Sequence, residues 1–92
     1  MKKKSIIQIL ARSYAIEILR LLKEKPLRFV DLKELCRSNR TASARLKELE
    51  EKKLIKPVPR LIEKRAYTFY EITPLGESVL KLCEKLFEFD QK

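Results

Sequence analysis

Positive side chains gather in two short segments of the chain, where their types and spacing suit the binding of phosphate. Residues 37–47 contain four cations and no acid, namely Arg37, Arg40, Arg45 and Lys47. Residues 56–65 contain Lys56, Arg60, Lys64 and Arg65 against the single acid Glu63. Guanidinium and ammonium groups at this density neutralise phosphate oxygens. The chemistry that these segments indicate is therefore the binding of a polyanion.

Short polar side chains lie among the first group of cations. Asn39, Thr41 and Ser43 can donate hydrogen bonds to base edges and accept them in return, which neutralisation of a phosphate backbone does not require. Their presence favours base reading over purely electrostatic binding.

Residue types that commonly carry out catalysis are missing or isolated. The chain has no His, and its single Gly excludes a glycine-rich phosphate loop. Cys36 and Cys83 lie far apart in sequence and have no His partners, so they do not form a zinc motif. We expect no enzymatic activity, no metal and no cofactor. Packing is the expected role of both cysteines, and a disulfide within or between chains stays an open alternative.

The overall charge balance agrees with a polyanionic partner. Lys and Arg total 22 against 13 acids, which gives a net charge of +9 over 92 residues. The charged fraction of 38% is typical of thermophilic proteins. However, thermophilic enrichment raises acidic and basic residues together, so it does not by itself explain a positive net charge. No apolar run is long enough to cross a membrane, and the basic start before Ile6 lacks the features of a signal peptide. We therefore expect a cytoplasmic, nucleoid-associated protein with no membrane partner.

Hydrophobic side chains recur at helical spacing in four segments, which are residues 5–24, 30–36, 40–52 and 74–89. The first segment could form two helices, with Ser13 as the N-cap of the second. In the third segment Ala42, Leu46 and Leu49 share one face. The polar residues 37–39 separate the second segment from the third. Two short helices joined by such a turn predict a helix-turn-helix, in which the second helix projects from a small core.

A change of pattern follows the third helix. Residues 56–62 cannot form a helix, and Pro57 and Pro59 restrict them to an edge strand. Residues 66–72 are rich in aromatic and β-branched types and are predicted to be the paired strand, with residues 63–65 at the tip.

The remaining segments complete a predicted fold. Residues 27–29 could form one short extended pairing segment, and Thr73 before Pro74 marks the start of the last helix. The predicted fold class is α+β and mainly helical. It is a winged helix-turn-helix with a three-helix core, a β-hairpin wing at about residues 56–70 and a C-terminal helix. We expect one domain over residues 1–92.

Residues 14–79 resemble the winged-helix transcription regulators of the HxlR and ArsR groups, especially their archaeal members. The resemblance is carried by residues 15–19 (AIEIL), 26–32 (PLRFVDL), 41–55 (TASARLKELEEKKLI) and 70–76 (YEITPLG). It departs from those groups at Lys53, where Gly is usual and suits a left-handed helix end. The cysteine and histidine patterns of the redox-sensing and metal-sensing relatives are also absent, so the resemblance implies no effector site.

The resemblance implies a double-stranded DNA partner and places the contacts. Residues of the recognition helix, about 40–52, would lie in the major groove, and the wing would lie on the flanking backbone or minor groove. Arg45 lies nearer the buried stripe, so a phosphate contact and a structural role are both open. The candidate DNA-binding residues are Arg37, Ser38, Asn39, Arg40, Thr41, Ser43, Ala44, Arg45, Lys47, Arg60, Lys64 and Arg65.

The last helix has a hydrophobic face wider than one core contact needs. One stripe consists of Leu75, Val79, Leu82, Leu86 and Phe89, and Leu80, Cys83 and Phe87 widen it. The first helix is similarly broad around Tyr14. These faces predict a homodimer that contacts through Tyr14, Leu80, Cys83 and Phe87, with its recognition helices about one DNA turn apart. The alternative is that the two terminal helices cover each other within one chain.

The function predicted from these patterns is sequence-specific binding of double-stranded DNA by a homodimeric transcription regulator. One alternative is an architectural, chromatin-like protein that uses the same cations without base discrimination. The other is a winged helix that makes protein contacts, although Ala44 is the one apolar residue on the exposed recognition face.

Overall fold

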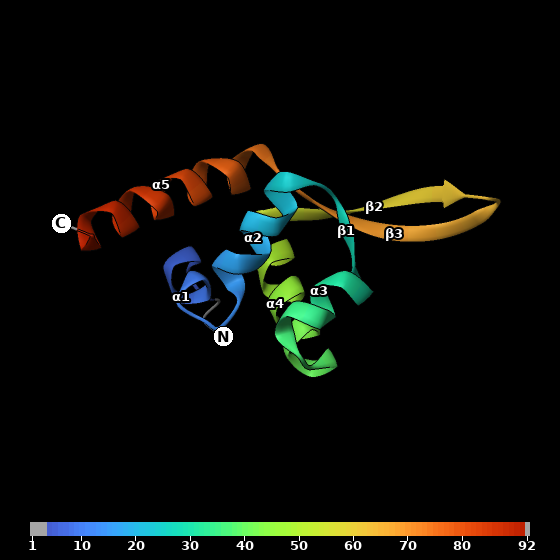
Figure 1. Ribbon diagram of the computed structural model, residues 1–92, viewed down its shortest axis with the longest axis horizontal. Helices are drawn as coiled ribbons and strands as arrows, with labels where there is room; N and C mark the ends of the chain where they lie inside the picture. The colour runs from blue at the N-terminus through green and yellow to red at the C-terminus, as the bar shows by residue number, and fades with distance from the viewer. Residues whose placement is uncertain (1–3, 92) are drawn as a thin grey trace.

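The computed structural model describes residues 4–91, which form five helices and a three-stranded antiparallel sheet (Figure 1). In chain order the elements are α1 (Ile6–Leu10), α2 (Ala15–Glu24), β1 (Leu27–Arg28), α3 (Phe29–Cys36), α4 (Asn39–Glu51), β2 (Ile55–Ile62), β3 (Arg65–Ile72) and α5 (Pro74–Asp90). The helices pack together, while the β2–β3 hairpin extends away from them as a long arm. This arrangement confirms the predicted winged helix-turn-helix.

Side-chain caps fix where the first and last helices begin. Ser5 Oγ accepts a hydrogen bond from the Gln8 amide at 3.2 Å at the start of α1. Thr73 Oγ1 accepts from the Gly76 amide at 3.0 Å at the start of α5, as the Thr-Pro pair predicts. The predicted cap at Ser13 is wrong. Tyr14 directly precedes α2, has a φ of 69° and makes no side-chain cap, so Ser13 lies outside the helix.

The end of α4 has a Schellman geometry built without glycine. The Leu54 amide donates to the Leu49 carbonyl at 3.0 Å, and the Lys53 amide donates to the Glu50 carbonyl at 2.9 Å. Lys53 has a φ of 61°, the left-handed conformation that the resemblance implies for this position. A side chain in that conformation costs about 1 kcal/mol relative to glycine.

The helix-turn-helix has a shorter turn than the sequence predicts. Arg37, with a φ of 59°, and Ser38 form the whole connection, because Asn39 already belongs to α4. Ser38 caps α4 by accepting a hydrogen bond from the Thr41 amide at 3.2 Å. The recognition helix therefore covers Asn39–Glu51 instead of residues 40–52.

The wing is a regular hairpin at the edge of a sheet whose strand order is β1-β3-β2. β1 pairs with the core end of β3, which confirms an extended segment there, although it covers only Leu27 and Arg28 because the predicted third residue, Phe29, already begins α3. Ile62 pairs with Arg65, so the turn contains only Glu63 and Lys64, both with positive φ (50° and 70°). This is the twist of a type I′ turn. β2 is an edge strand, as its two prolines predict.

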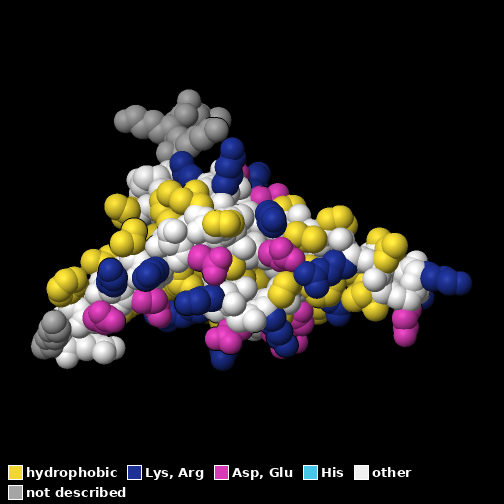
Figure 2. All heavy atoms as spheres, turned by 90° about the horizontal axis from the view of Figure 1, so that it is seen from above, with side chains coloured by type: hydrophobic (Ala, Val, Ile, Leu, Met, Phe, Trp, Pro, Cys, Tyr) yellow, Lys and Arg dark blue, Asp and Glu magenta, His cyan; other side chains and the backbone are white. Residues whose placement is uncertain are grey.

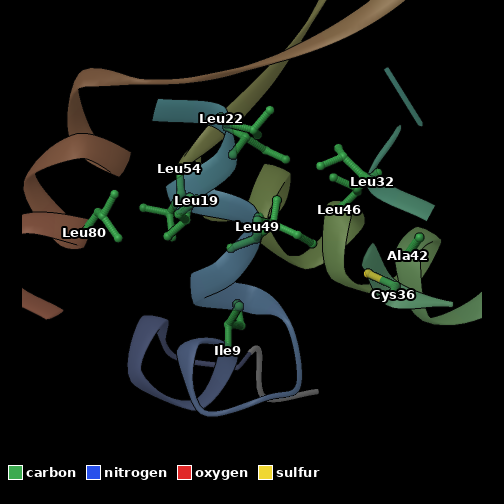
Figure 3. Close-up of a cluster of buried hydrophobic side chains, with 12 residues drawn as sticks. Ile9, Leu19, Leu22, Leu32, Cys36, Ala42, Leu46, Leu49, Leu54 and Leu80 are labelled. Carbon is green, nitrogen blue, oxygen red and sulfur yellow. The ribbon is translucent and has the colours of Figure 1, made fainter. Parts of the chain in front are cut away.

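The core joins all five helices to the root of the wing (Figure 3). Leu19 of α2, Leu49 of α4 and Leu54 before β2 are fully buried at its centre, and Ile9 and Leu80 bring α1 and α5 into it. Ala42, Leu46 and Leu49 face this core, which confirms the predicted buried stripe of the recognition helix. None of the helices in residues 4–91 has the length and apolar character needed to cross a membrane.

Candidate nucleic-acid interface

The face of α4 opposite the core is exposed, and its N-terminal part is basic, since the exposed acids Glu50 and Glu51 come only after Lys47. Asn39, Arg40, Ser43 and Lys47 are exposed, and Thr41 and Ala44 are half-buried beside them. Within residues 4–91 neither Arg40 nor Lys47 forms an ion pair, so both charges are available to an external anion. The structure thus brings the predicted residues of this helix other than Arg45 onto one surface, with Arg37 and Ser38 at its entry. We call the side chains of Arg40, Ser43, Ala44 and Lys47 the recognition face.

Arg45 turns the other way and has a structural role. Only 8% of this residue is exposed. Its Nε donates to the Ser13 carbonyl at 2.9 Å, and its Nη1 donates to Glu48 Oε1 at 2.6 Å. These bonds tie α4 to the turn before α2, so of the two roles predicted for Arg45 the structure shows the structural one.

Glu48 gathers three cations on the inner side of α4. Its carboxylate lies 2.6 Å from Arg45 Nη1, 2.7 Å from Lys4 Nζ and 3.5 Å from Arg12 Nε. Burial by itself raises the pKa of the Glu48 carboxyl, but the hydrogen bonds from Lys4 and Arg45 and the charge of Arg12 outweigh it and lower the pKa below its usual value. This acid is therefore neutralised inside the protein and does not oppose the positive recognition face.

The wing has two chemically different faces, because side chains alternate along its strands. The inner face carries Pro57, Pro59, Leu61, Ala66, Thr68 and Tyr70, and it is the side on which Tyr70 and Ile72 pack against the core. The outer face carries Lys56, Val58, Arg60, Ile62, Arg65, Tyr67, Phe69 and Glu71. All the charges of the two strands lie on the outer face.

The predicted wing cations differ in how free they are. Arg60 is paired with Glu71 at 2.6 Å and lies 5.3 Å over the Phe69 ring, so part of its charge is already satisfied. Lys64 and Arg65 are exposed at the tip and form no ion pair within residues 4–91. Figure 2 shows positive side chains at this end of the wing, and hydrophobic ones along its length. The tip is thus the more available part of the wing for an anion.

A hollow lies between the recognition face and the root of the wing, and sequence reasoning missed it. Its walls are Ser43, Leu46, Lys47 and Glu50 of α4 together with Phe29 and Tyr70. Burial, and secondarily the charge of Glu50, raises the pKa of the Tyr70 hydroxyl. No sequence pattern predicts this hollow, because it brings Tyr70 of β3 beside α4 and Phe29, which are far from it in the chain.

The four residues predicted for a dimer interface are in different environments. Leu80 and Cys83 pack into their own chain, at 2% and 6% exposure, and Tyr14 is half-buried against the same core. Phe87 is exposed and lies 5.0 Å from the Arg20 guanidinium carbon. Apart from Phe87, the exposed large hydrophobic side chains of α5 belong to the other stripe, namely Leu75, Leu82, Leu86 and Phe89. Figure 2 shows hydrophobic side chains along the left margin, where α5 lies.

A groove with mostly apolar walls separates α5 from the first two helices. Ile7, Leu10 and Ile16 form one wall, and Cys83, Leu86 and Phe87 form the other. α5 packs against α2, where Arg20 pairs with Glu84, but Ile7 and Leu86 stay largely exposed, so the terminal helices cover each other only in part. Cys36 and Cys83 are both free thiols, and burial raises the pKa of each, which disfavours the reactive thiolate.

Comparison with known proteins gives one family and one fold. The HxlR-like helix-turn-helix family model matches residues 9–92. Among curated proteins, none matches the chain at a significant level.

Three solved structures illustrate the similarity of fold. The reduced form of the transcriptional regulator YodB from Bacillus subtilis superposes with a TM-score of 0.79 at 22% identity, over 90% of this chain and 82% of that one. A PadR family transcription regulator from Clostridium difficile gives 0.77 at 22% identity, over 86% and 92%. A regulator described as a member of the MarR family from Enterococcus faecalis gives 0.77 at 19% identity, over 92% and 78%.

Proposed function

We propose, because this chain belongs to the HxlR-like helix-turn-helix family, that it binds specific sites on double-stranded DNA as a homodimeric transcription regulator. Its family and fold are those of transcription regulators and not of enzymes. In this proposal α4 lies in the major groove, the tip of the wing contacts the adjacent backbone or minor groove, and the protein acts on the chromosome in the cytoplasm.

The observation that carries the proposal is the recognition face. Arg40 and Lys47 are exposed on α4 without an internal ion pair, while the nearby Glu48 is held inside by Lys4, Arg12 and Arg45. Ser43 lies between the two cations and is exposed on the same face. A positive helix with short polar side chains suits both phosphates and base edges.

The double variant Arg40→Ala/Lys47→Ala tests this face. We expect its affinity for duplex DNA to depend less steeply on salt, with a logarithmic slope shallower by about 1.8 for each bound recognition helix if two phosphate contacts are lost. The measurement is fluorescence anisotropy of a labelled duplex across a salt series. The matched control, Lys81→Ala/Lys85→Ala, removes two exposed cations from α5 and should keep the wild-type slope.

The same experiment separates the alternatives. Selection from random duplexes should enrich one site, whereas equal binding to all sequences would indicate an architectural protein. If the recognition-face variant and the α5 control have the same slope, α4 is not the DNA-binding helix. If the wild-type chain binds no duplex DNA, the proposal is wrong and the winged helix is expected to bind another protein instead.

The homodimer part of the proposal relies on the uncovered stripe of α5. Leu82 and Leu86 are 63% and 65% exposed, and Leu75 continues the same stripe. Aliphatic side chains in a row of this length are removed from water when two copies pack their last helices together. The apolar groove beside α5 would receive part of the partner. In this dimer Leu80 and Cys83 support the interface from within their own chain instead of contacting the partner.

Charged side chains in that stripe should separate the dimer. We expect the variant Leu82→Glu/Leu86→Glu to sediment as a monomer in analytical ultracentrifugation, because two carboxylates per chain would lose hydration at the interface. The control Lys81→Glu makes the same change in net charge on the polar side of α5 and should remain dimeric. If the Leu82→Glu/Leu86→Glu variant stays dimeric, the dimer interface lies on a surface other than this stripe of α5.

A further inference from the structure

An aliphatic side chain is held in water on the inner face of the wing, close to its tip. Leu61 is 77% exposed and pairs with Ala66, one residue pair before the turn. The inner face carries no charged side chain along the strands. Beyond the core, its side chains are those of Pro57, Pro59, Leu61, Ala66 and Thr68. Nothing within residues 4–91 covers Leu61. Burial of this side chain against a partner would therefore lower the free energy by removing apolar surface from water.

Cations flank this side chain on both sides. Lys64 lies in the turn beyond it and Arg65 begins the returning strand, both exposed and without an ion pair within the described residues. Arg60 precedes it on the outer face. The chemical pattern is one apolar group between positive groups on a narrow, two-stranded tip. The minor groove of DNA has phosphates along both edges and sugars along its walls, and apolar side chains can insert from it between base steps.

We propose that Leu61 is a wedge that enters the minor groove and partly unstacks a base step there, so that the wing bends the DNA. This inference deepens the proposed function and rests on it. Lys64, in the turn at the tip, binds a phosphate beside the groove, and the apolar inner face follows the sugars. Unstacking costs least at flexible pyrimidine–purine steps, so these steps beside the site bound by α4 are preferred although no hydrogen bond reads them.

The inner face is the correct side for this role because the recognition helix lies on that side of the sheet. Tyr70 belongs to the inner face and forms a wall of the hollow together with Ser43 and Lys47 of α4. A duplex lying on the recognition face therefore meets the inner face of the wing. Ile62, one residue further along β2, points to the outer face and away from that duplex.

The alternation between Leu61 and Ile62 supplies a matched pair of variants. The probe is a duplex selected from a random pool by the wild-type protein, with dyes at its ends for energy transfer and 2-aminopurine at the candidate step. We expect the wild type to bend it by about 20–90° and to raise the 2-aminopurine fluorescence. Leu61→Ala should abolish the fluorescence rise, reduce the bend by more than half and weaken binding about tenfold. Ile62→Ala should behave like the wild type, and Leu61→Met should restore most of the bend.

The salt dependence separates this inference from the function on which it rests. Leu61→Ala removes no phosphate contact, so its affinity should fall without a change in the logarithmic salt slope. Wild-type protein that binds the selected duplex tightly but leaves it straight would overturn the wedge and leave the proposed function intact. Equal losses in Leu61→Ala and Ile62→Ala would also overturn it, because they would indicate general damage to the tip. Absence of any duplex binding by the wild type would overturn both.

Discussion

Replacing Gly76 with alanine is expected to lower the free energy of unfolding by about 3 kcal/mol, because a methyl group there has no space. Gly76 is buried in the first turn of α5. A Cβ at this position would collide with the Leu54 carbonyl oxygen and lie 2.8 Å from Ile72 Cγ1. The Leu54 carbonyl is backbone and already accepts a hydrogen bond from the Thr73 amide at 3.0 Å, so it cannot move without disturbing the start of α5.

The prediction is checked by urea unfolding followed by circular dichroism, with Ser78→Ala as the control. Ser78 is exposed on the same helix, and there alanine should be neutral or slightly stabilising, since it has the higher helix propensity. The same propensity favours alanine at position 76 by about 1 kcal/mol, so a loss of stability must come from the collision. Equal unfolding midpoints for Gly76→Ala and Ser78→Ala would show that α5 shifts freely.

Glu48→Gln is expected to destabilise the protein by about 3 kcal/mol at pH 7, because it leaves Arg45 without its counter-charge in a largely buried position. The glutamine keeps the size of the side chain and one acceptor oxygen, so the loss reports charge and not packing. Lys4 and Arg12 lose the same partner, but their exposure makes their share small. Glu51→Gln, an exposed carboxylate on the same helix, is the control and should change little.

The effect of Glu48 should depend on pH with a definite sign. Its folded-state pKa lies below the ordinary value of about 4.3, so the ionised form stabilises the fold. That contribution is fully present above the ordinary pKa and is lost as the pH falls through the lowered one. The stability gap between the wild type and Glu48→Gln should therefore be widest at neutral pH and shrink below about pH 4. A gap that is constant between pH 7 and pH 3 would contradict the assigned role of the carboxylate.

The elements of this fold could be predicted from the sequence where one short segment contains the whole signal. The spacing of Ala42, Leu46 and Leu49 defines the buried side of the recognition helix. Thr73 with Pro74 marks a helix start, and the prolines of β2 mark an edge strand. Each of these depends on local geometry, which the residues determine without help from distant parts of the chain.

Features that depend on distant partners could not be predicted in the same way. Arg45 lies at the border of the buried stripe, and only the folded chain shows that its guanidinium meets the Ser13 carbonyl, 32 residues away. The last helix is apolar over so much of its circumference that spacing cannot tell which flank covers its own core. The structure assigns Leu80 to that core and leaves Leu82 in water.

An arm that leaves the core as two strands has a long open edge, and open edges recruit strands from other copies of the same protein. In β2, Pro57 and Pro59 have no amide hydrogen to offer, and the exposed Lys56 adds a charge that repels a second β2. The aggregation that a bare hairpin with an exposed leucine invites is thereby discouraged. The same prolines that define the edge strand thus reduce aggregation of the protein. This effect matters most during synthesis, when many copies of the chain fold close to one another.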